Sequence, residues 1–355
     1  MVEQATFDPF FVVFWQAILS ILSERKNQMS ESMLERIQRK AGVSELIDVL
    51  VERLAPTDLQ SLLLEVYRRR TASVQPSHLL ERYERDRFVR PSAVSPGILA
   101  DFDRLVWSLL PECYAAIELS PICPLGTNAS VATVDQNKVV TTIRNTEVVS
   151  DATNVLALEC ASRRRLLLRR NPQNRERVCL CTSHRVVRAQ AYQDAPGVLP
   201  HFRLLSLCTA GCDEGSFQFE TASLIEQIAF YVQLLHEAAH LGYQAHRIRV
   251  ALTDLEQGRR EHILTKQVLM PLLARYPDIL CEFDPNRESG RGYYAGVCFH
   301  IYATNAAATE LELIDGGFTT WTRQLLSNNK ERLLISGLGT ERLCSQFNTL
   351  PTNAD

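Results

Sequence analysis

The strongest local signal in this 355-residue sequence lies near its end, in Ser336-Gly337-Leu338-Gly339-Thr340-Glu341-Arg342-Leu343. Gly337 and Gly339 have no Cβ, so a strand built from them can pass close to a ligand before the chain turns into a helix. Arg342 follows that turn, where a guanidinium can bind a polyanion. The pattern indicates a nucleotide-binding edge of a sheet, although glycine-flanked turns with a surface arginine also occur without a ligand.

The composition around this stretch is that of an ordinary soluble protein, with 46% hydrophobic and 22% charged residues. A net charge of −3 argues against a protein that coats nucleic acid. The ten cysteines are widely scattered and match neither a zinc framework nor a secreted disulfide scaffold, so we expect reduced, mostly buried thiols. The apolar run from Phe10 to Leu22 is too short to span a bilayer and predicts a buried amphipathic helix. We therefore expect a cytoplasmic protein with no membrane association.

The chain divides into a helical front and a sheet-rich back. Residues 8–86 have apolar side chains at three- and four-residue spacing, which predicts helices throughout. The segment from Arg90 to Gly97 then breaks this periodicity with Pro91 and Pro96. We expect an all-helical N-terminal domain over residues 1–95 and a second domain over residues 96–355.

The second domain alternates short β-like runs with a few long helical stretches. Most neighbouring strands are joined by short connections rather than by a helix each, which favours a mostly antiparallel sheet flanked by helices and an α+β fold. Helices are predicted at residues 98–110, 154–168, 222–241 and 256–276. Strands are predicted at residues 115–119, 131–134, 139–143, 178–181, 202–208, 248–252, 293–302, 311–314 and 333–336.

Two charged motifs are weaker candidates for function. His236-Glu237-Ala238-Ala239-His240 has the spacing of a zinc-binding helix, but a third ligand such as His246 would lie across a turn, and histidines also suit a helix C-terminus. Arginines at positions 163–165, 169, 170, 175 and 177 could contact phosphates, although a solvated helix end explains them as well. This arginine cluster is the best place in the sequence for a nucleic-acid contact.

A stronger pattern runs from Cys179 to Gln190 and resumes at Phe202. It predicts an antiparallel pair of strands joined by a long loop, with Arg188 at the mouth. Together with the closing glycine-arginine stretch, it resembles the catalytic core of class II aminoacyl-tRNA synthetases, and especially the histidyl type and its paralogues. The resemblance implies that Arg188 binds the ATP α-phosphate, that Phe202 stacks on adenine and that Arg342 binds the γ-phosphate. Gln190 stands where that family has a glutamate, and the resemblance implies that it also contacts ATP.

Further matches to this family follow in the same order along the chain. The strand at residues 115–119, ending near Pro121, resembles the first motif, which implies a homodimer. Ser150-Asp151-Ala152-Thr153 is similar to the segment that receives the substrate amino group. The tyrosine pair and the double glycine are similar to the amino-acid pocket. The substrate-binding residues that the resemblance implies are Asp151, Thr153, Tyr293, Tyr294, Gly316 and Gly317.

The chemistry of carboxylate activation agrees with this resemblance. Attack of a carboxylate on the ATP α-phosphorus needs fixed positive charge on both sides of the reacting phosphate, which arginines on rigid strands supply, usually with Mg²⁺. Acidic residues close to the double glycine are the candidates for that metal, namely Glu312 and Asp315, with Glu310 nearby.

Departures from the family narrow the expectation. The family's substrate-side arginine falls at Ser289, and Phe318-Thr319-Thr320 replaces its Arg-Tyr-Asp, so histidine is not the expected substrate. We expect no anticodon-binding domain after Arg342. We expect a paralogue that binds ATP and activates an amino acid or related carboxylic acid as an adenylate, for a protein or RNA acceptor. The alternative is a non-catalytic paralogue, similar to the regulatory subunit of ATP phosphoribosyltransferase, that binds a ligand or a protein partner.

Overall fold

The computed structural model describes residues 33–190 and 199–349, and the helix predicted between Phe10 and Leu22 lies outside them. The chain separates into two compact units, Met1–Ser73 and Val74–Asp355, which are described separately here. The segment 74–95, which the sequence analysis assigned to the helical front, is grouped with the larger unit. None of the described helices is long and apolar enough to cross a membrane.

The smaller unit consists of short helices. Residues 33–41 are helical, α2 (Leu46–Asp48) continues into the π-helix η1 (Val49–Arg53), and α3 spans Pro56–Thr71. Proline at the first position of α3 suits a helix start, because its missing N–H would have no partner there. Near the C-terminal end of α3, Arg68 and Arg69 both pair with Glu65, as expected for cations that close a helix.

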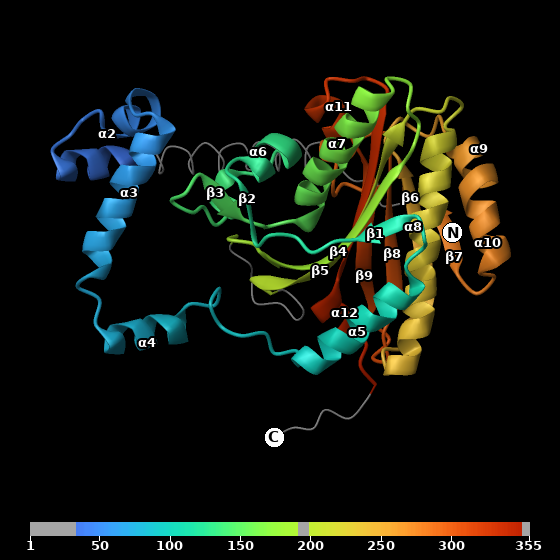
Figure 1. The fold of residues 1–355 in the computed structure, drawn as a ribbon. Coiled ribbons are helices and arrows are strands. Elements are labelled where there is room, and N and C mark those ends of the chain that lie inside the picture. Colours follow the sequence, from blue (N-terminus) through green and yellow to red (C-terminus); the bar gives the residue numbers. More distant parts are fainter. Residues whose placement is uncertain (1–32, 191–198, 350–355) are drawn as a thin grey trace, which may run out of the picture. The chain divides into compact units, whose positions relative to one another are not determined.

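The larger unit is built on one eight-stranded sheet with the order β1-β4-β5-β10-β9-β8-β6-β7 (Figure 1). Only the outermost pairs, β1–β4 and β6–β7, are parallel, and all other neighbours are antiparallel. This confirms the predicted α+β class with a mostly antiparallel sheet. The strands are β1 (Tyr114–Ala116), β4 (Val178–Val187), β5 (His201–Cys212), β6 (His246–Asp254), β7 (Leu280–Phe283), β8 (Val297–Thr304), β9 (Glu310–Thr319) and β10 (Glu331–Gly339).

Helices cover both faces of this sheet. One face packs against a group that includes α5 (Pro96–Leu109), α8 (Gln218–Ala238), α9 (Glu261–Leu264), η4 (Thr265–Leu269) and α10 (Met270–Arg275). The other packs against α7 (Ala152–Arg170) and α11 (Trp321–Leu325). The remaining elements are α4 (Pro76–Arg85), β2 (Ile122–Pro124), α6 (Thr127–Ala132), η2 (Gln136–Lys138), β3 (Thr146–Val148), η3 (Ala239–Leu241) and α12 (Thr340–Gln346).

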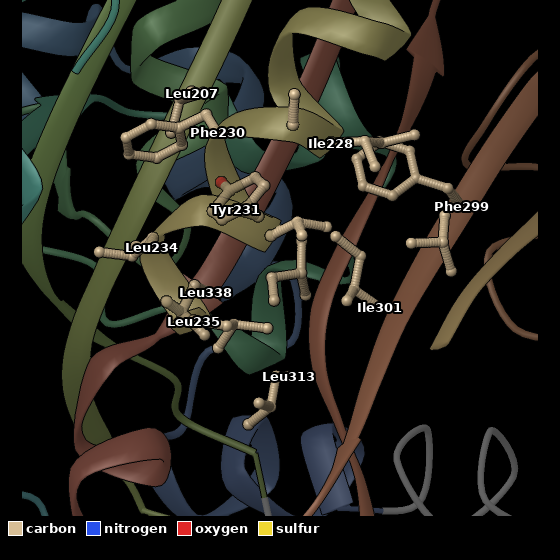
Figure 2. Close-up of a cluster of buried hydrophobic side chains, with 14 of the residues drawn as sticks. Leu207, Ile228, Phe230, Tyr231, Leu234, Leu235, Phe299, Ile301, Leu313 and Leu338 are labelled. Atoms are coloured by element: carbon tan, nitrogen blue, oxygen red, sulfur yellow. The ribbon is translucent and has the colours of Figure 1, made fainter. Parts of the chain in front are cut away.

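The larger hydrophobic core lies between the sheet and α8. Figure 2 shows Phe230, Tyr231 and Leu234 of α8 among side chains from β5, β8 and β10. Tyr231 is fully buried, and its hydroxyl accepts a hydrogen bond of 3.1 Å from Ser336 on β10. Each such apolar side chain contributes about 1.5–3 kcal/mol when buried. The core between the sheet and α8 therefore keeps the sheet rigid beneath α7 and α11 on its other face.

Three predictions about local structure are wrong. Residues 131–134, expected as a strand, fall at the end of α6, because Gly126 in the left-handed conformation starts a helix there. Residues 139–143 form only an isolated bridge at Thr141. The strand expected from Tyr293 begins at Val297 instead, since Gly292 and Gly296 have positive φ and turn the chain before it.

Candidate functional site

Arg188 and Phe202 lie together at the open end of the β4–β5 hairpin. Arg188 follows the last residue of β4, and Phe202 pairs with Val186 across the hairpin. The Arg188 guanidinium carbon lies 5.0 Å from the centre of the Phe202 ring. The two residues that the resemblance assigns to ATP are therefore neighbours, and a guanidinium already stacks on the aromatic ring.

Arg188 also contacts the start of α7. Its Nε donates to the carbonyl of Ser150 at 3.1 Å, and its Nη2 lies 3.4 Å from Oδ2 of Asp151. The other carboxylate oxygen of Asp151 caps α7 by accepting from the backbone N–H of Thr153 at 2.9 Å and from its hydroxyl at 2.7 Å. Such a cap contributes about 1 kcal/mol. Asp151 and Thr153 thus hold the helix start and Arg188 in one hydrogen-bonded unit.

A buried carboxylate, Glu147, is linked to this helix start through Asn128. Glu147 on β3 is fully buried and accepts from the backbone N–H groups of Gly126 and Asn128 at 3.0 and 2.9 Å, and from the amides of Asn128 and Gln136 at 2.6 and 2.8 Å. Burial raises the pKa of Glu147, but these hydrogen bonds outweigh it and hold the pKa below its ordinary value. Asn128 in turn accepts from the Ser150 hydroxyl at 2.7 Å. The sequence analysis missed Glu147, because no motif joins it to Ser150.

Gln190 is the last described residue before the gap at 191–198. Its carbonyl accepts from Nη2 of Arg87 at 2.6 Å, which ties the segment before α5 to the end of the hairpin. The predicted ATP contact of Gln190 stays a prediction.

The tyrosine pair packs against α11 and β9. The Tyr293 ring meets Tyr294 edge-on at 4.9 Å and Trp321 edge-on at 5.3 Å. A Cβ on Gly317 would lie 2.6 Å from Cδ1 of Tyr294, and one on Gly316 would meet the rings and side chains packed on the opposite face. The double glycine is required here because aromatic rings occupy the space that side chains would need.

The polar and charged side chains near Tyr293 come from segments that are far apart in the sequence. Burial raises the pKa of Tyr293 well above its ordinary value, and the nearby charge of Asp151 raises it further, while Thr153 and Arg188 lower it. Asp315 on β9 also raises it. Predicted ATP, substrate and metal residues from four separate segments, Asp151 with Thr153, Arg188, Tyr293 and Asp315, are therefore close enough to influence one another's charge.

Arg287 is the main residue that the sequence analysis missed. Its side chain is 2% exposed, its Nη2 lies 2.7 Å from Oδ1 of Asp315, and its guanidinium lies 5.3 Å from the centre of the Tyr294 ring. Its Nε donates to the carbonyl of Ser289 at 2.8 Å. Nη1 is buried and has no hydrogen-bond partner among the described residues. An arginine two residues before the expected position thus enters the site, because the turn through Gly290 and Gly292 redirects the chain.

His300 on β8 completes the surroundings of Asp315. Its Nε2 lies 3.4 Å from Oδ1 of Asp315, and its Nδ1 lies 2.8 Å from the hydroxyl of Tyr302. Burial lowers the pKa of His300 to about 4, so the imidazole is neutral at neutral pH. Asp315 therefore lies between a buried cation and a neutral imidazole.

Glu312 also lies near His300, with Oε2 at 3.5 Å from Nε2 of the imidazole, and the charge of Arg342 acts on it. Burial raises the pKa of Glu312, the charge of Asp315 raises it further, and Arg342 lowers it. Nε of Arg342 is buried without a hydrogen-bond partner among the described residues. The preceding Glu341 is fully buried, lies 2.7 Å from Nη2 of Arg185 and also accepts from the backbone N–H of Arg203. The start of α12, and with it Arg342, is thereby anchored to the same hairpin that carries Arg188.

The two weaker motifs, the histidine pair and the arginine cluster, lie apart from this group of residues. His236 pairs with Asp278 at 2.9 Å and His240 lies 3.5 Å from Glu237, so the histidine pair shares no metal geometry. Arg165 and Arg169 line a surface hollow of about 420 Å³. A larger cavity of about 900 Å³ lies at the sheet edge around His246. Neither cavity includes the residues grouped around Tyr293.

Comparison with known proteins places this arrangement in a known fold. No family model and no curated protein matches the sequence. An ATP phosphoribosyltransferase regulatory subunit/histidyl-tRNA synthetase from Bacillus halodurans C matches with a TM-score of 0.54 and 16% identity over 74% of this chain and 83% of that one. Apo histidyl-tRNA synthetase from S. aureus matches with a TM-score of 0.51 and 14% identity, over 72% and 68% of the two chains.

A threonyl-tRNA synthetase RNA binding domain from Cryptosporidium parvum Iowa II also matches, with a TM-score of 0.51 and 9% identity over 71% of this chain and 63% of that one. Identities this low establish the fold alone. The chain has a class II synthetase-like fold, as the sequence resemblance implied.

Proposed function

We propose that this protein binds ATP and activates an amino acid or a related carboxylic acid as its adenylate. The observation that carries this proposal is that buried guanidinium N–H groups lack a partner among the described residues, namely Nη1 of Arg287, Nε of Arg342 and Nε of Arg203. The charges of the first two, Arg287 and Arg342, both lower the pKa of Glu312. A buried donor left unpaired costs about 1–3 kcal/mol, and more when it is charged. An anionic ligand that reached Arg287 and Arg342 would satisfy both of these N–H groups.

The proposed roles of Arg188 and Arg342 are those that the resemblance implies, and Arg287 is added to them. Arg188 binds the α-phosphate beside Phe202, and Arg342 binds the γ-phosphate at the start of α12. Arg287 binds the substrate carboxylate or the α-phosphate from the side of the tyrosine pair. Fixed guanidinium groups in a partly buried site stabilise the charge that develops at phosphorus without reorganisation. Because Arg188 stacks on Phe202 in this structure, adenine binding requires the guanidinium to share or leave that ring.

The substrate amino group is assigned to Asp151, with Tyr293 and Tyr294 as walls of the pocket. Both oxygens of Asp151 are engaged, one by Thr153 and one at 3.4 Å from Arg188, so the longer contact is the one that a ligand would replace. The backbone at Gly316 and Gly317 forms the floor on β9. Homodimerisation and a protein or RNA acceptor belong to the same proposal.

Mg²⁺ fits the donor set that this site offers. It commonly binds through one or two carboxylates together with substrate phosphates, and Glu312 and Asp315 supply two carboxylates on one strand. Arg287 holds one oxygen of Asp315, which leaves its other oxygen and Glu312 for the metal. When bound, the ion would neutralise phosphate charge.

Exchange of labelled pyrophosphate into ATP, measured with a panel of amino acids and other carboxylic acids, tests the proposal. We expect exchange with one substrate class and a loss of about 10²–10³-fold in Arg188→Ala or Arg342→Ala. Arg247→Ala, which changes an exposed arginine outside the group, is the matched control. Folded protein that binds ATP but supports no exchange with any acid would contradict the proposal.

A non-catalytic regulatory role is the second candidate. It is favoured by Gln190 in place of the family's glutamate and by the pairing of Arg188 with Asp151. In that case ATP binding is dispensable, and Arg188→Ala protein would still co-purify with its partner. Loss of ATP binding and of exchange in the same variant would favour the enzyme instead.

A further inference from the structure

Cys113, Cys179 and Glu226 form a cluster away from the site around Tyr293. Cys113 precedes β1, Cys179 lies on β4 and Glu226 lies on α8, so three separate elements contribute to it. The two sulfur atoms and a carboxylate oxygen all lie within 4.8 Å of one another. Over residues 33–190 and 199–349, this is the one group of three cysteine, histidine or acidic side chains with such spacing.

The closest contact within the cluster is already short. The Cys113 thiol donates to Oε1 of Glu226 at 3.0 Å. Tetrahedral zinc has Zn–S distances of about 2.3 Å and Zn–O distances of about 2.0–2.2 Å, which places its ligand atoms about 3.5–3.8 Å apart. The three atoms therefore need to move by about 1 Å at most to share an ion. Cys113 is exposed, which gives an ion an entry path and leaves the fourth position to water.

Arg177 supplies the outer hydrogen bonds that a zinc-binding carboxylate needs. Its Nη1 lies 3.2 Å from Oε2 of Glu226, on the side away from Cys113, while its Nη2 contact to Oε1 is longer, at 3.4 Å. Two thiolates, one carboxylate, one guanidinium and a divalent ion sum to zero charge. Electroneutrality matters in this partly buried place, because an unbalanced charge there is costly. Arg177 thus holds the carboxylate and balances the site rather than excluding the cation.

The thiols are protonated before any ion binds. Burial, and then the Glu226 carboxylate, raises the pKa of Cys113 to about 12 and that of Cys179 to about 11. Thiols of this kind are poor nucleophiles, which disfavours a disulfide switch between them. Ion binding must release both protons, so affinity rises steeply with pH.

We propose that Cys113, Cys179 and Glu226 bind a thiophilic divalent cation of the zinc class, with water as the fourth ligand. The site joins the start of β1 to β4 and α8. Its role is structural, because the ion would clamp the edge strand to the body of the sheet.

Cadmium is the probe for this site, since cadmium bound by thiolates gives an ultraviolet charge-transfer band. Reduced, metal-free full-length protein is titrated with Cd²⁺, and the band is expected to saturate at one ion per chain. Cys113→Ser should lose most of the band, whereas Cys281→Ser, which changes a partly buried cysteine outside the cluster, should keep it. Glu226→Gln should weaken binding by about 10–100-fold while keeping the band at saturation.

Two outcomes would overturn the proposal. One is the absence of a saturable band in the wild-type protein. The other is a band of equal intensity in Cys113→Ser and wild type. Because Cys113 is exposed, its serine variant is expected to fold, and circular dichroism checks this directly.

Discussion

Two buried arginines in this protein pair with a carboxylate, and they differ in a way that separates structure from function. Arg164 on α7 and Glu331 on β10 have fully buried side chains at 2.8 Å. Arg164 also donates to Asn174 and to the carbonyl of Glu176, so all of its nitrogen atoms have partners. Arg287 is equally buried, but its partner Asp315 is 43% exposed and its Nη1 has no acceptor among the described residues.

Burial alone does not identify an arginine that binds a ligand. Arg164 joins α7 to the central strand and has no capacity left for a ligand. Arg287 has the same desolvation and keeps one donor free beside an accessible carboxylate. Nη1 of Arg287 lacks a partner among the described residues and lies beside a carboxylate that a ligand can reach, and these two features together mark a candidate ligand site.

Breaking the Arg164–Glu331 pair should have the largest effect on stability. In Glu331→Ala, Arg164 keeps its charge in a dry interior without a counter-ion, and we expect a loss of about 3–5 kcal/mol in the free energy of unfolding, measured by urea denaturation. Glu310→Ala, which breaks the more exposed pair with Arg249, is the control and should lose about 1 kcal/mol or less. Equal losses in the two variants would contradict the distinction.

Glu147 tests whether hydrogen bonds alone can hold a buried carboxylate without an arginine. Glu147→Gln should lose about 1.5–3 kcal/mol, because hydrogen bonds to a charged acceptor become neutral ones and one amide donor faces other donors. The folded pKa of Glu147 lies below its unfolded value of 4.5, so its contribution is present above that value and disappears as the pH falls through the folded pKa. Unfolding curves of variant and wild type should therefore differ at neutral pH and converge in acid. A constant difference across this range would speak against the assignment.

His300, which lies beside Asp315, allows a test of the Arg287–Asp315 pair by pH. Its pKa falls from 6.5 to about 4 on folding, so the unfolded chain binds the extra proton first, and stability declines as the pH drops from 6.5 toward 4. His300→Gln should flatten this decline by about 1–2 kcal/mol. Thermal melts across this pH range measure it, and an unchanged slope would show that the imidazole does not stay neutral.

The Arg287–Asp315 pair itself should matter least for the free energy of unfolding. Asp315→Asn keeps the shape and leaves a partly exposed contact, so we expect a loss of about 1 kcal/mol or less. Ligand binding or pyrophosphate exchange should fall by at least about tenfold, because Arg287 and the tyrosine pair lose their charged neighbour. A large loss of stability with unchanged ligand binding would reverse the roles assigned to the two pairs.

The sequence predicted the fold class and most of the long helices and strands, but not the short elements between Ile122 and Val148. It also placed side chains that strand alternation fixes. Phe202 lies beside Arg188 because both stand at matching ends of a regular hairpin. Arg287 could not be placed, since its direction depends on the positive φ angles of a turn that spacing does not encode. Glu147 was missed because no sequence motif joins it to its partners Gly126, Asn128 and Gln136, which lie up to 21 residues away. The metal cluster escaped notice because its ligands lie on three elements far apart in the sequence.

The position of β10 has a consequence for how the chain folds during synthesis. It is the last strand in sequence order, yet it lies between β5 and β9 near the middle of the sheet. The β4–β5 and β8–β9 hairpins can form from local contacts as soon as they leave the ribosome, whereas β10 must pair with partners as distant as Leu204 opposite Gly339. Until it arrives, β5 and β9 are two open strand edges that other chains can join. The nascent protein therefore depends on the arrival of β10, or on a chaperone, to stay free of aggregation.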